Sequence, residues 1–196
     1  MQKIGAIILA AGNSSRLGKP KQLLQFRGQT LLRRMVDAAT AAQCLPVTVV
    51  IGSDRNRVAQ ELTETKELLV ENETWKRGIG NSIRAGLRGT LTAYPKTEAI
   101  VLLTCDQPLV DAKIIDALKT RYAETAKPIV ASAYSDTLGV PALFARRYFD
   151  ELFVLDDGAG AKQVILKHKD DVAEFPFPEG AIDIDTPEDY EKLIQR

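Results

Sequence analysis

The sequence predicts one α/β domain with three layers, in which a mostly parallel β-sheet lies between two layers of helices. Short apolar runs alternate along the chain with longer segments of helical periodicity, which is the pattern of βαβ units. The apolar runs contain almost no polar residues, as is typical of strands that helices cover on both faces. The chain has 196 residues with 45% hydrophobic content, which suits one domain over residues 1–196 and is short for two.

The elements follow one another in a regular order up to residue 133. Strands are expected where Val, Ile, Leu and Ala run together, and helices where apolar residues recur about every three to four positions. The expected strands are 4–10, 47–51, 68–70, 99–103 and 129–133, and the expected helices are 30–43, 55–65, 81–91 and 111–125. Ligands of such sheets bind beyond the carboxyl ends of the strands, so the loops after residues 10 and 103 are expected to meet there.

The pattern loosens after residue 133. An apolar run at 139–144, a short helix at 145–151 and a helix ending near Lys167 are interpreted as an insertion or flap around the site. A loop with two prolines at 175–180 and a short strand at 182–185 follow. A last helix is expected to begin at Thr186, because a threonine N-cap, a proline in the first helical position and an acid in the first turn all favour a helix start.

The charge and composition exclude several classes of partner. Lys plus Arg and Asp plus Glu are each 26, so no net field favours a nucleic acid or an acidic membrane surface, and neither partner is expected. The apolar run at 3–10 is too short to span a bilayer and lacks the features of a signal peptide, so a cytoplasmic location is expected. Cys44, Cys105 and the single histidine, His168, are too few for a zinc cluster, and both thiols are expected to be reduced.

A loop rich in Gly and Ser, residues 11–15, follows the first expected strand. It offers bare backbone amides where an apolar strand gives way to a helix-like segment, and Arg16 and Lys21 lie just behind it. Amides and cations together favour an anion such as a polyphosphate, so the chain is expected to bind a nucleoside triphosphate. The alternative is a tight turn whose basic residues merely face water.

This loop differs from two familiar phosphate loops. Five residues separate Gly12 from Gly18, whereas the Walker motif has four, and Pro20 follows Lys19 where a serine or threonine should bind magnesium. The glycines also fail to fit G-x-G-x-x-G, and a helix cannot run through Pro20. Hydride transfer with a dinucleotide therefore loses its main support.

Two groups of carboxylates are candidates for holding a metal ion. Asp106 comes just after the apolar run at 99–103, where a carboxylate needs a cation such as magnesium beside phosphates. Otherwise it caps the next helix or stabilises the turn at Pro108. Asp183 and Asp185 alternate with isoleucines and so share one side of the expected strand. They face open water if this strand lies at a sheet edge, and share magnesium with Asp106 if it lies near that residue.

Three segments together resemble a known family. They are residues 9–24, residues 103–108 with the sequence LTCDQP, and residues 183–189 with the sequence DIDTPED. The chain closely resembles the MobA-like nucleotidyltransferases, and within them the molybdenum cofactor cytidylyltransferases of the MocA type. These motifs are spread from residue 4 to about residue 193. The resemblance implies a Rossmann-like, GT-A-like nucleotidyltransferase fold.

The resemblance also implies a role for each motif. Arg16, Lys21 and Asp106 would be the catalytic groups, and Asp106 would hold Mg²⁺ together with Asp185, or with Asp183 in its place. The implied nucleotide-binding residues are Leu9, Ala10, Ala11, Gly12, Arg16, Lys21, Gly80, Ser82 and Asp106. Gly80 and Ser82 match the family's base-recognition loop, although taken alone they indicate only a helix N-cap. The expected acceptor-side residues are Gly139, Asp157 and Asp183, and the order Asp157-Gly158 departs from the Gly-Asp of many relatives.

The implied reaction is nucleotidyl transfer, with CTP as donor and the phosphate of a molybdopterin cofactor as acceptor, and it releases pyrophosphate. A phosphate monoester is already largely dianionic at neutral pH, so no general base is required. A molybdoenzyme of the xanthine dehydrogenase type is the implied protein partner. The alternatives are GTP or ATP as donor, a sugar or polyol phosphate as acceptor, and a carrier that binds the cofactor without catalysis.

Overall fold

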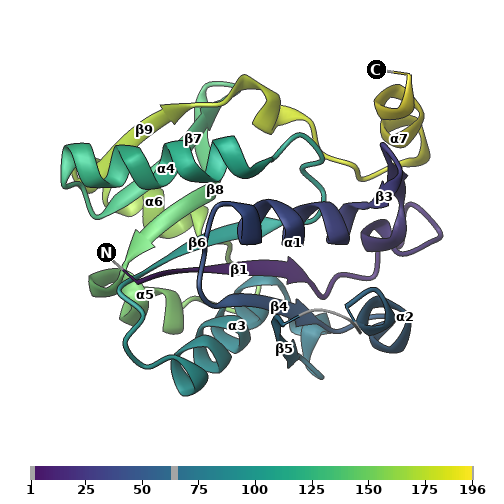
Figure 1. Cartoon of the computed structure of the whole chain (residues 1–196), viewed down its shortest axis with the longest axis horizontal. Coiled ribbons are helices and arrows are strands. Elements are labelled where there is room, and N and C mark those ends of the chain that lie inside the picture. The colour runs from purple at the N-terminus through teal and green to yellow at the C-terminus, as the bar shows by residue number, and fades with distance from the viewer. Residues whose placement is uncertain (1–2, 63–65, 196) are drawn as a thin grey trace.

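The computed structural model describes residues 3–62 and 66–195, which form a central sheet with helices on both faces (Figure 1). In this described part the sheet has seven strands in the order β5-β4-β1-β6-β8-β7-β9. The strands are β1 Ile4–Ala10, β4 Val47–Ile51, β5 Leu68–Glu71, β6 Ala99–Thr104, β7 Ile129–Tyr134, β8 Thr137–Ala145 and β9 Val172–Pro176, and Gln25–Phe26 (β2) pairs separately with Gln29–Thr30 (β3). The helices are α1 Leu31–Ala41, α2 Arg55–Gln60, α3 Ile79–Ala93, α4 Ala112–Thr125, α5 Phe149–Phe153, α6 Lys162–Lys167 and α7 Pro187–Ile194.

The sheet is mostly parallel, as predicted. Only β8 runs against its neighbours among the described strands of the large sheet. Figure 1 shows α1 and α4 on one side of the sheet and α3 and α5 on the other. The predicted three-layer α/β/α architecture is therefore confirmed.

The two faces of the sheet bury separate cores, and β1 contributes to both. Ile8 packs in the core that includes α1 and α4, whereas its neighbour Ile7 packs in the core that includes α3, α5 and α6, and both side chains are 0% exposed. Successive residues of a strand point to opposite faces. A strand that is covered on both faces therefore has the unbroken apolar sequence found at residues 4–10.

The prediction of an insertion or flap at 139–144 is wrong, because this run belongs to β8, which lies between β6 and β7 in the sheet. A tight turn joins β7 to β8, and its residues Ser135 and Asp136 have φ of 48° and 55°. Turns of this kind favour Asn and Gly, so a Ser-Asp pair gives no clear hairpin signal. Pro141 within the run also argues against a strand. In the structure it lies near an irregularity in the ladder, where the Ser132 hydroxyl donates to the Pro141 carbonyl at 2.7 Å.

The predicted strand at 182–185 is also wrong. These residues have no strand pairing, although Ile184 is 0% exposed in a small cluster with Leu17, Leu24 and Leu193. Ile184 is apolar because it packs against this cluster rather than because it has a place in the sheet.

The sequence misses β9, an edge strand parallel to β7, because it predicts a loop from residue 175. The expected helix at 55–65 corresponds to α2, which ends at Gln60. The last three residues of the predicted helix, 63–65, lie outside the described residues.

Helix α7 begins with the predicted cap. The Thr186 hydroxyl accepts from the Asp189 amide at 3.2 Å, and the Asp189 carboxylate accepts from the Thr186 amide at 2.9 Å. We expect Thr186→Ala to lower the free energy of unfolding by about 1 kcal/mol, since it leaves an end amide without its partner. Urea unfolding measures the loss. Thr186→Ser keeps the hydroxyl and is the control, and equal stability of the alanine and serine variants would contradict the prediction.

Candidate active site

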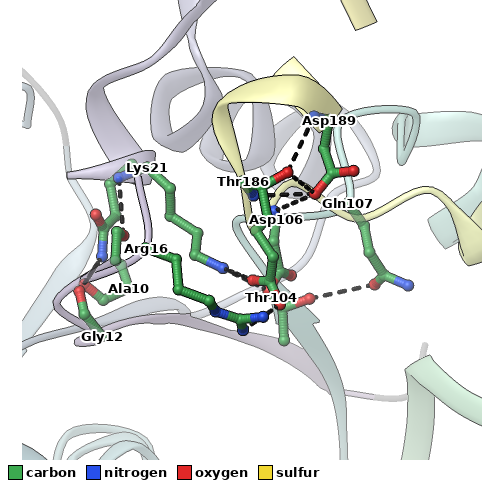
Figure 2. Close-up of polar contacts among 12 residues, drawn as sticks. Ala10, Gly12, Arg16, Lys21, Thr104, Asp106, Gln107, Thr186 and Asp189 are labelled. Carbon is green, nitrogen blue, oxygen red and sulfur yellow. Dashed lines mark hydrogen bonds and ion pairs between the residues drawn. The ribbon is translucent and has the colours of Figure 1, made fainter. Parts of the chain in front are cut away.

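The candidate site lies at the carboxyl ends of β1 and β6. These strands are parallel neighbours, with Leu9 paired to Thr104 in the ladder. The loop after β1 and the residues after β6 therefore leave the sheet side by side, as the sequence predicts. Figure 2 shows the side chains of Arg16 and Lys21 reaching from this loop toward the Asp106 side.

Gln22, which is 2% exposed, shapes the loop after β1. Its Nε2 donates to the carbonyls of Ala10 at 2.8 Å and Gly12 at 2.9 Å. The Ala11 carbonyl between them accepts from the Ser53 amide at 3.0 Å. Three successive carbonyl groups thus have protein donors. The sequence analysis did not single out Gln22, whose only signal is a polar residue directly after Lys21.

Lys21 and Arg16 meet two of the predicted carboxylates. The Lys21 Nζ lies 3.1 Å from Asp106 Oδ2 and 2.8 Å from Asp185 Oδ1. An Arg16 guanidinium nitrogen lies 2.6 Å from Asp185 Oδ2. The Lys21 side chain is 16% exposed and that of Arg16 is 69% exposed, so one cation is fixed inside the cluster and the other lies at its rim. The structure therefore brings together four of the six charged residues predicted for the site, Arg16, Lys21, Asp106 and Asp185.

The charges in this cluster change the pKa values of its members. Burial by itself would lower the pKa of Lys21, but the Asp106 charge and the bonds to Asp185 and Asp106 outweigh it, so that the pKa is raised. The hydrogen bond from Lys21 is the main cause that lowers the pKa of Asp185. Lost hydration and the negative charges of Asp185 and Asp106 raise the pKa of the nearby Asp183. Lys21 and Asp185 are therefore stabilised as an ion pair.

A cavity of about 310 Å³ opens beside the cluster, between the loop after β1 and the start of α3. Its lining residues are Leu9, Ala11, Gly12, Asn13, Lys21, Gln22, Trp75, Lys76, Gly78, Ile79, Ser82, Thr104, Cys105 and Asp106. Among the described residues, the predicted contacts Ala10, Arg16 and Gly80 are not part of this lining. Trp75 and Lys76 are, and the sequence analysis missed them. The available signal is that Trp75 is the only tryptophan in the chain and lies two residues before Arg77, where the predicted base-recognition segment begins.

A second cavity, of about 290 Å³, shares Thr104 and Asp106 with the first. Its other lining residues are Gln107, Tyr134, Ser135, Val140, Gly180, Ala181 and Asp183. Asp106 is therefore in the walls of both cavities. Gly139 lies next to this region, where any Cβ would collide with the Tyr134 hydroxyl. Its lack of a side chain is explained by packing against Tyr134.

Asp157 lies beside residues 77–87, the segment predicted to be the base-recognition loop. Its carboxylate pairs with Arg77 at 2.7 Å and with Arg84, and its carbonyl accepts from the Gly80 amide at 2.9 Å. A Cβ on Gly78 or Gly80 would collide with backbone carbonyls of this segment. The bonds from Arg84 and then Arg77 lower the pKa of Asp157. These contacts favour a role in shaping the nucleotide side over the acceptor-side role predicted from the sequence.

We expect Asp157→Asn to raise the KM for the nucleotide about three- to tenfold with little change in kcat, because a neutral side chain holds the two arginines less firmly. Steady-state kinetics with varied nucleotide measure the effect. Asp156→Asn is the matched control, since Asp156 is the exposed neighbouring residue. A fall in kcat without a change in KM for the nucleotide would contradict this assignment.

The pair of carboxylates fits a divalent ion. Carboxylate oxygens are the ligands that Mg²⁺ prefers, and Mg²⁺ commonly uses one or two of them beside substrate phosphates. Asp106 and Asp185 already share one cationic group, the Lys21 ammonium. No cluster of three or more His, Cys, Asp or Glu with metal-binding geometry occurs within residues 3–62 and 66–195. Phosphate oxygens would therefore have to complete such a site.

A membrane-spanning helix is not found in the part of the chain that the structure describes.

A family model matches most of this chain. The model of the MobA-like NTP transferase domain matches residues 6–172. The chain belongs to the MobA-like NTP transferase family. Its similarity to Rv0371c of Mycobacterium tuberculosis is 30% identity with a TM-score of 0.82, over 100% of this chain and 98% of that one. A structure of Rv0371C in complex with manganese matches at 28% identity and a TM-score of 0.77, over 99% of each chain.

Relatives of this MobA-like domain have names from different reaction classes. A probable molybdenum cofactor guanylyltransferase of Nostoc sp. is 27% identical over 96% of this chain and 89% of its own length. The nicotine blue oxidoreductase of Paenarthrobacter nicotinovorans is 28% identical over 97% and 96%. The bifunctional protein GlmU of Sorangium cellulosum is 29% identical over 86% of this chain, which spans only 35% of that protein. The family is thus established, whereas the individual substrates are not.

Proposed function

We propose that this MobA-like domain is a Mg²⁺-dependent nucleotidyltransferase that transfers CMP from CTP to the phosphate of a molybdopterin cofactor and releases pyrophosphate. The observation that carries the proposal is the contact of Lys21 with both Asp106 and Asp185 beside the loop after β1. This arrangement combines fixed cations, two carboxylates and a cavity of about 310 Å³. A polyphosphate with a divalent ion is the ligand that such a combination suits.

In the proposed complex the nucleotide occupies the cavity lined by Gly12, Trp75 and Ser82. The carbonyls of residues 10–12 have protein donors, so the loop offers its amides to the phosphates. Arg16, at the exposed rim, can bind two phosphate oxygens at once through its planar guanidinium. Lys21 contributes a protonated ammonium, because its raised pKa keeps it charged at neutral pH.

Nucleotidyl transfer then needs placement and charge stabilisation more than proton transfer. The acceptor phosphate, already a dianion, attacks the α-phosphorus in line, the new P–O bond forms, and the bond to the pyrophosphate oxygen breaks. Arg16 and Lys21 stabilise the charge that grows on the leaving oxygens. Mg²⁺ held by Asp106 and Asp185 would supply further positive charge beside the phosphates.

The acceptor is assigned to the second cavity, whose wall includes Asp106 and Asp183. Molybdopterin as acceptor and CTP as donor rest on the motifs in the sequence, and a relative named as a probable molybdenum cofactor guanylyltransferase supports the acceptor. Delivery of the product to a molybdoenzyme of the xanthine dehydrogenase type completes the proposal.

Pyrophosphate release tests the proposal directly. The purified chain is incubated with Mg²⁺ and each of CTP, GTP, ATP and UTP, without an acceptor, with molybdopterin, or with a sugar or polyol phosphate. We expect release only when CTP and molybdopterin are both present. Release with GTP or ATP would change the donor, and release with a sugar or polyol phosphate would change the acceptor.

Trp75 provides an independent measure of binding, since it is the only tryptophan and lies in the proposed nucleotide cavity. Quenching of its fluorescence by CTP is expected. Binding of molybdopterin without pyrophosphate release under any condition would favour a non-catalytic carrier. Oxidation of NADH or NADPH without pyrophosphate release would instead favour an activity like that in the name of the Paenarthrobacter relative.

A further inference from the structure

We propose that Gln107 is a positioning residue, which holds the segment before Asp185 so that the two metal-binding carboxylates face each other. This inference rests on the proposed function, because it assigns Gln107 a role toward the Asp106–Asp185 site. Gln107 directly follows Asp106, and its side chain does not contact either carboxylate in the described hydrogen bonds.

Gln107 is 4% exposed, and its carboxamide joins three parts of the fold. Its Nε2 donates to the Val140 carbonyl of β8 and to the Gly180 carbonyl, both at 2.9 Å. Its Oε1 accepts from the Thr104 hydroxyl at 3.2 Å (Figure 2). Both amide hydrogens and the oxygen therefore have partners, which fixes the orientation of the group.

The segment that Gln107 holds has little other regular structure. Gly180 lies in a 3₁₀ turn, Pro178–Ala181, and residues 182–185 form no strand. The Ile184 amide donates to the Asp106 carbonyl at 3.0 Å. Two consecutive residues that follow β6 thus hold this segment at two points. The Asp106 carbonyl holds Ile184, and the Gln107 side chain holds Gly180.

The hydrogen bond between Ile184 and Asp106 does not by itself fix the direction of the segment that runs from Gly180 to Asp185. The hydrogen bond and the buried side chain of Ile184 hold the end of the segment next to Asp185, whereas the hydrogen bond at Gly180 holds its beginning and so sets the path by which it approaches Asp185. Gly180 is also closely packed, since a Cβ there would lie 2.7 Å from Tyr134 and 2.8 Å from Phe177. Removal of the Gln107 amide would leave the buried Gly180 carbonyl without this donor and loosen the approach to Asp185, whereas the Val140 carbonyl would keep the Tyr134 hydroxyl at 2.9 Å.

The test is the affinity for Mn²⁺ of Gln107→Met, a variant that keeps the length of the side chain but has no amide. Free Mn²⁺ is measured by electron paramagnetic resonance, with and without CTP. We expect about a tenfold loss of Mn²⁺ affinity, the lower end of the effect of disturbing groups that orient metal ligands. Binding of CTP without metal, followed by Trp75 fluorescence, should be unchanged.

The matched control is Thr90→Val, which removes a buried hydrogen bond to Thr48 of 2.8 Å away from the site. It is expected to lower thermal stability without changing Mn²⁺ affinity. A folded Gln107→Met protein with the Mn²⁺ affinity of the wild type would overturn the positioning role. If Gln107→Met does not fold, Thr104→Val tests the same point, because it frees the carboxamide to rotate. We then expect several-fold weaker Mn²⁺ binding for Thr104→Val than for Thr104→Ser, and equal affinities would overturn the role.

Failure of the proposed function gives a different result. If Asp106→Asn leaves the Mn²⁺ affinity of the protein unchanged, the carboxylates are not the metal site, and the proposed reaction loses its basis whatever Gln107 does. If Asp106→Asn abolishes Mn²⁺ binding and Gln107→Met does not weaken it, only the positioning role fails.

Discussion

Asp106→Asn is expected to lower the rate of pyrophosphate release by at least about 10²-fold, the scale of removing one electrostatic stabiliser from an active site. Asparagine keeps the shape of the side chain and still accepts a hydrogen bond from Lys21, but it loses the negative charge. In the proposed site that charge holds Mg²⁺ beside the phosphates, and no other described carboxylate lies in the walls of both cavities. Turnover is measured at saturating CTP and molybdopterin.

Two measurements separate loss of the site from loss of the fold. Asp116→Asn is the control, because Asp116 lies on α4 and pairs with Lys119 rather than with the cluster; its turnover should equal that of the wild type. The thermal unfolding temperature of Asp106→Asn should be close to that of the wild type, since its side chain is partly exposed. Near-normal turnover in a folded Asp106→Asn protein would remove Asp106 from the catalytic site.

The sequence predicts the elements that depend on local pattern. β1, β4 and β6 are recognisable because strands buried on both faces need unbroken apolar runs. β8 is missed because its pairing depends on neighbours distant in sequence and its turn uses Ser135 and Asp136 without glycine. The 182–185 segment shows the opposite error. Its alternating pattern is real, but Ile184 packs into a side cluster and the segment has no strand partner.

The same distinction applies to the site. Arg16, Lys21, Asp106 and Asp185 lie together in the structure, but their predicted roles come from the resemblance to the MobA-like family. Taken alone, the same residues also fit a turn that faces water, a helix cap and an exposed strand. The side chain of Gln107 bonds to Thr104 and to Val140 and Gly180, two residues that only the folded chain brings near it. Buried polar side chains of this kind have no distinctive sequence pattern, and their importance follows from the partners that they satisfy.

Lys21→Met is expected to have two effects of opposite sign. The ammonium lies between Asp106 and Asp185 and neutralises part of their charge. Without it, the carboxylates should bind Mn²⁺ alone more tightly, because a divalent ion no longer competes with a fixed cation for the same oxygens. The triphosphate, by contrast, loses a cation at the leaving oxygens, and kcat/KM for CTP should fall about 10²-fold.

These opposite signs make the experiment specific. General damage to the site would weaken Mn²⁺ binding and catalysis together, whereas removal of a competing cation strengthens the first and weakens the second. Lys19→Met is the matched control, because the Lys19 ammonium lies 5.2 Å from the centre of the Tyr190 ring instead of on the carboxylates. An unchanged kcat/KM in Lys21→Met would exclude Lys21 from phosphate binding. Weaker Mn²⁺ binding would show that Lys21 holds the carboxylates in place, rather than competing with the metal for them.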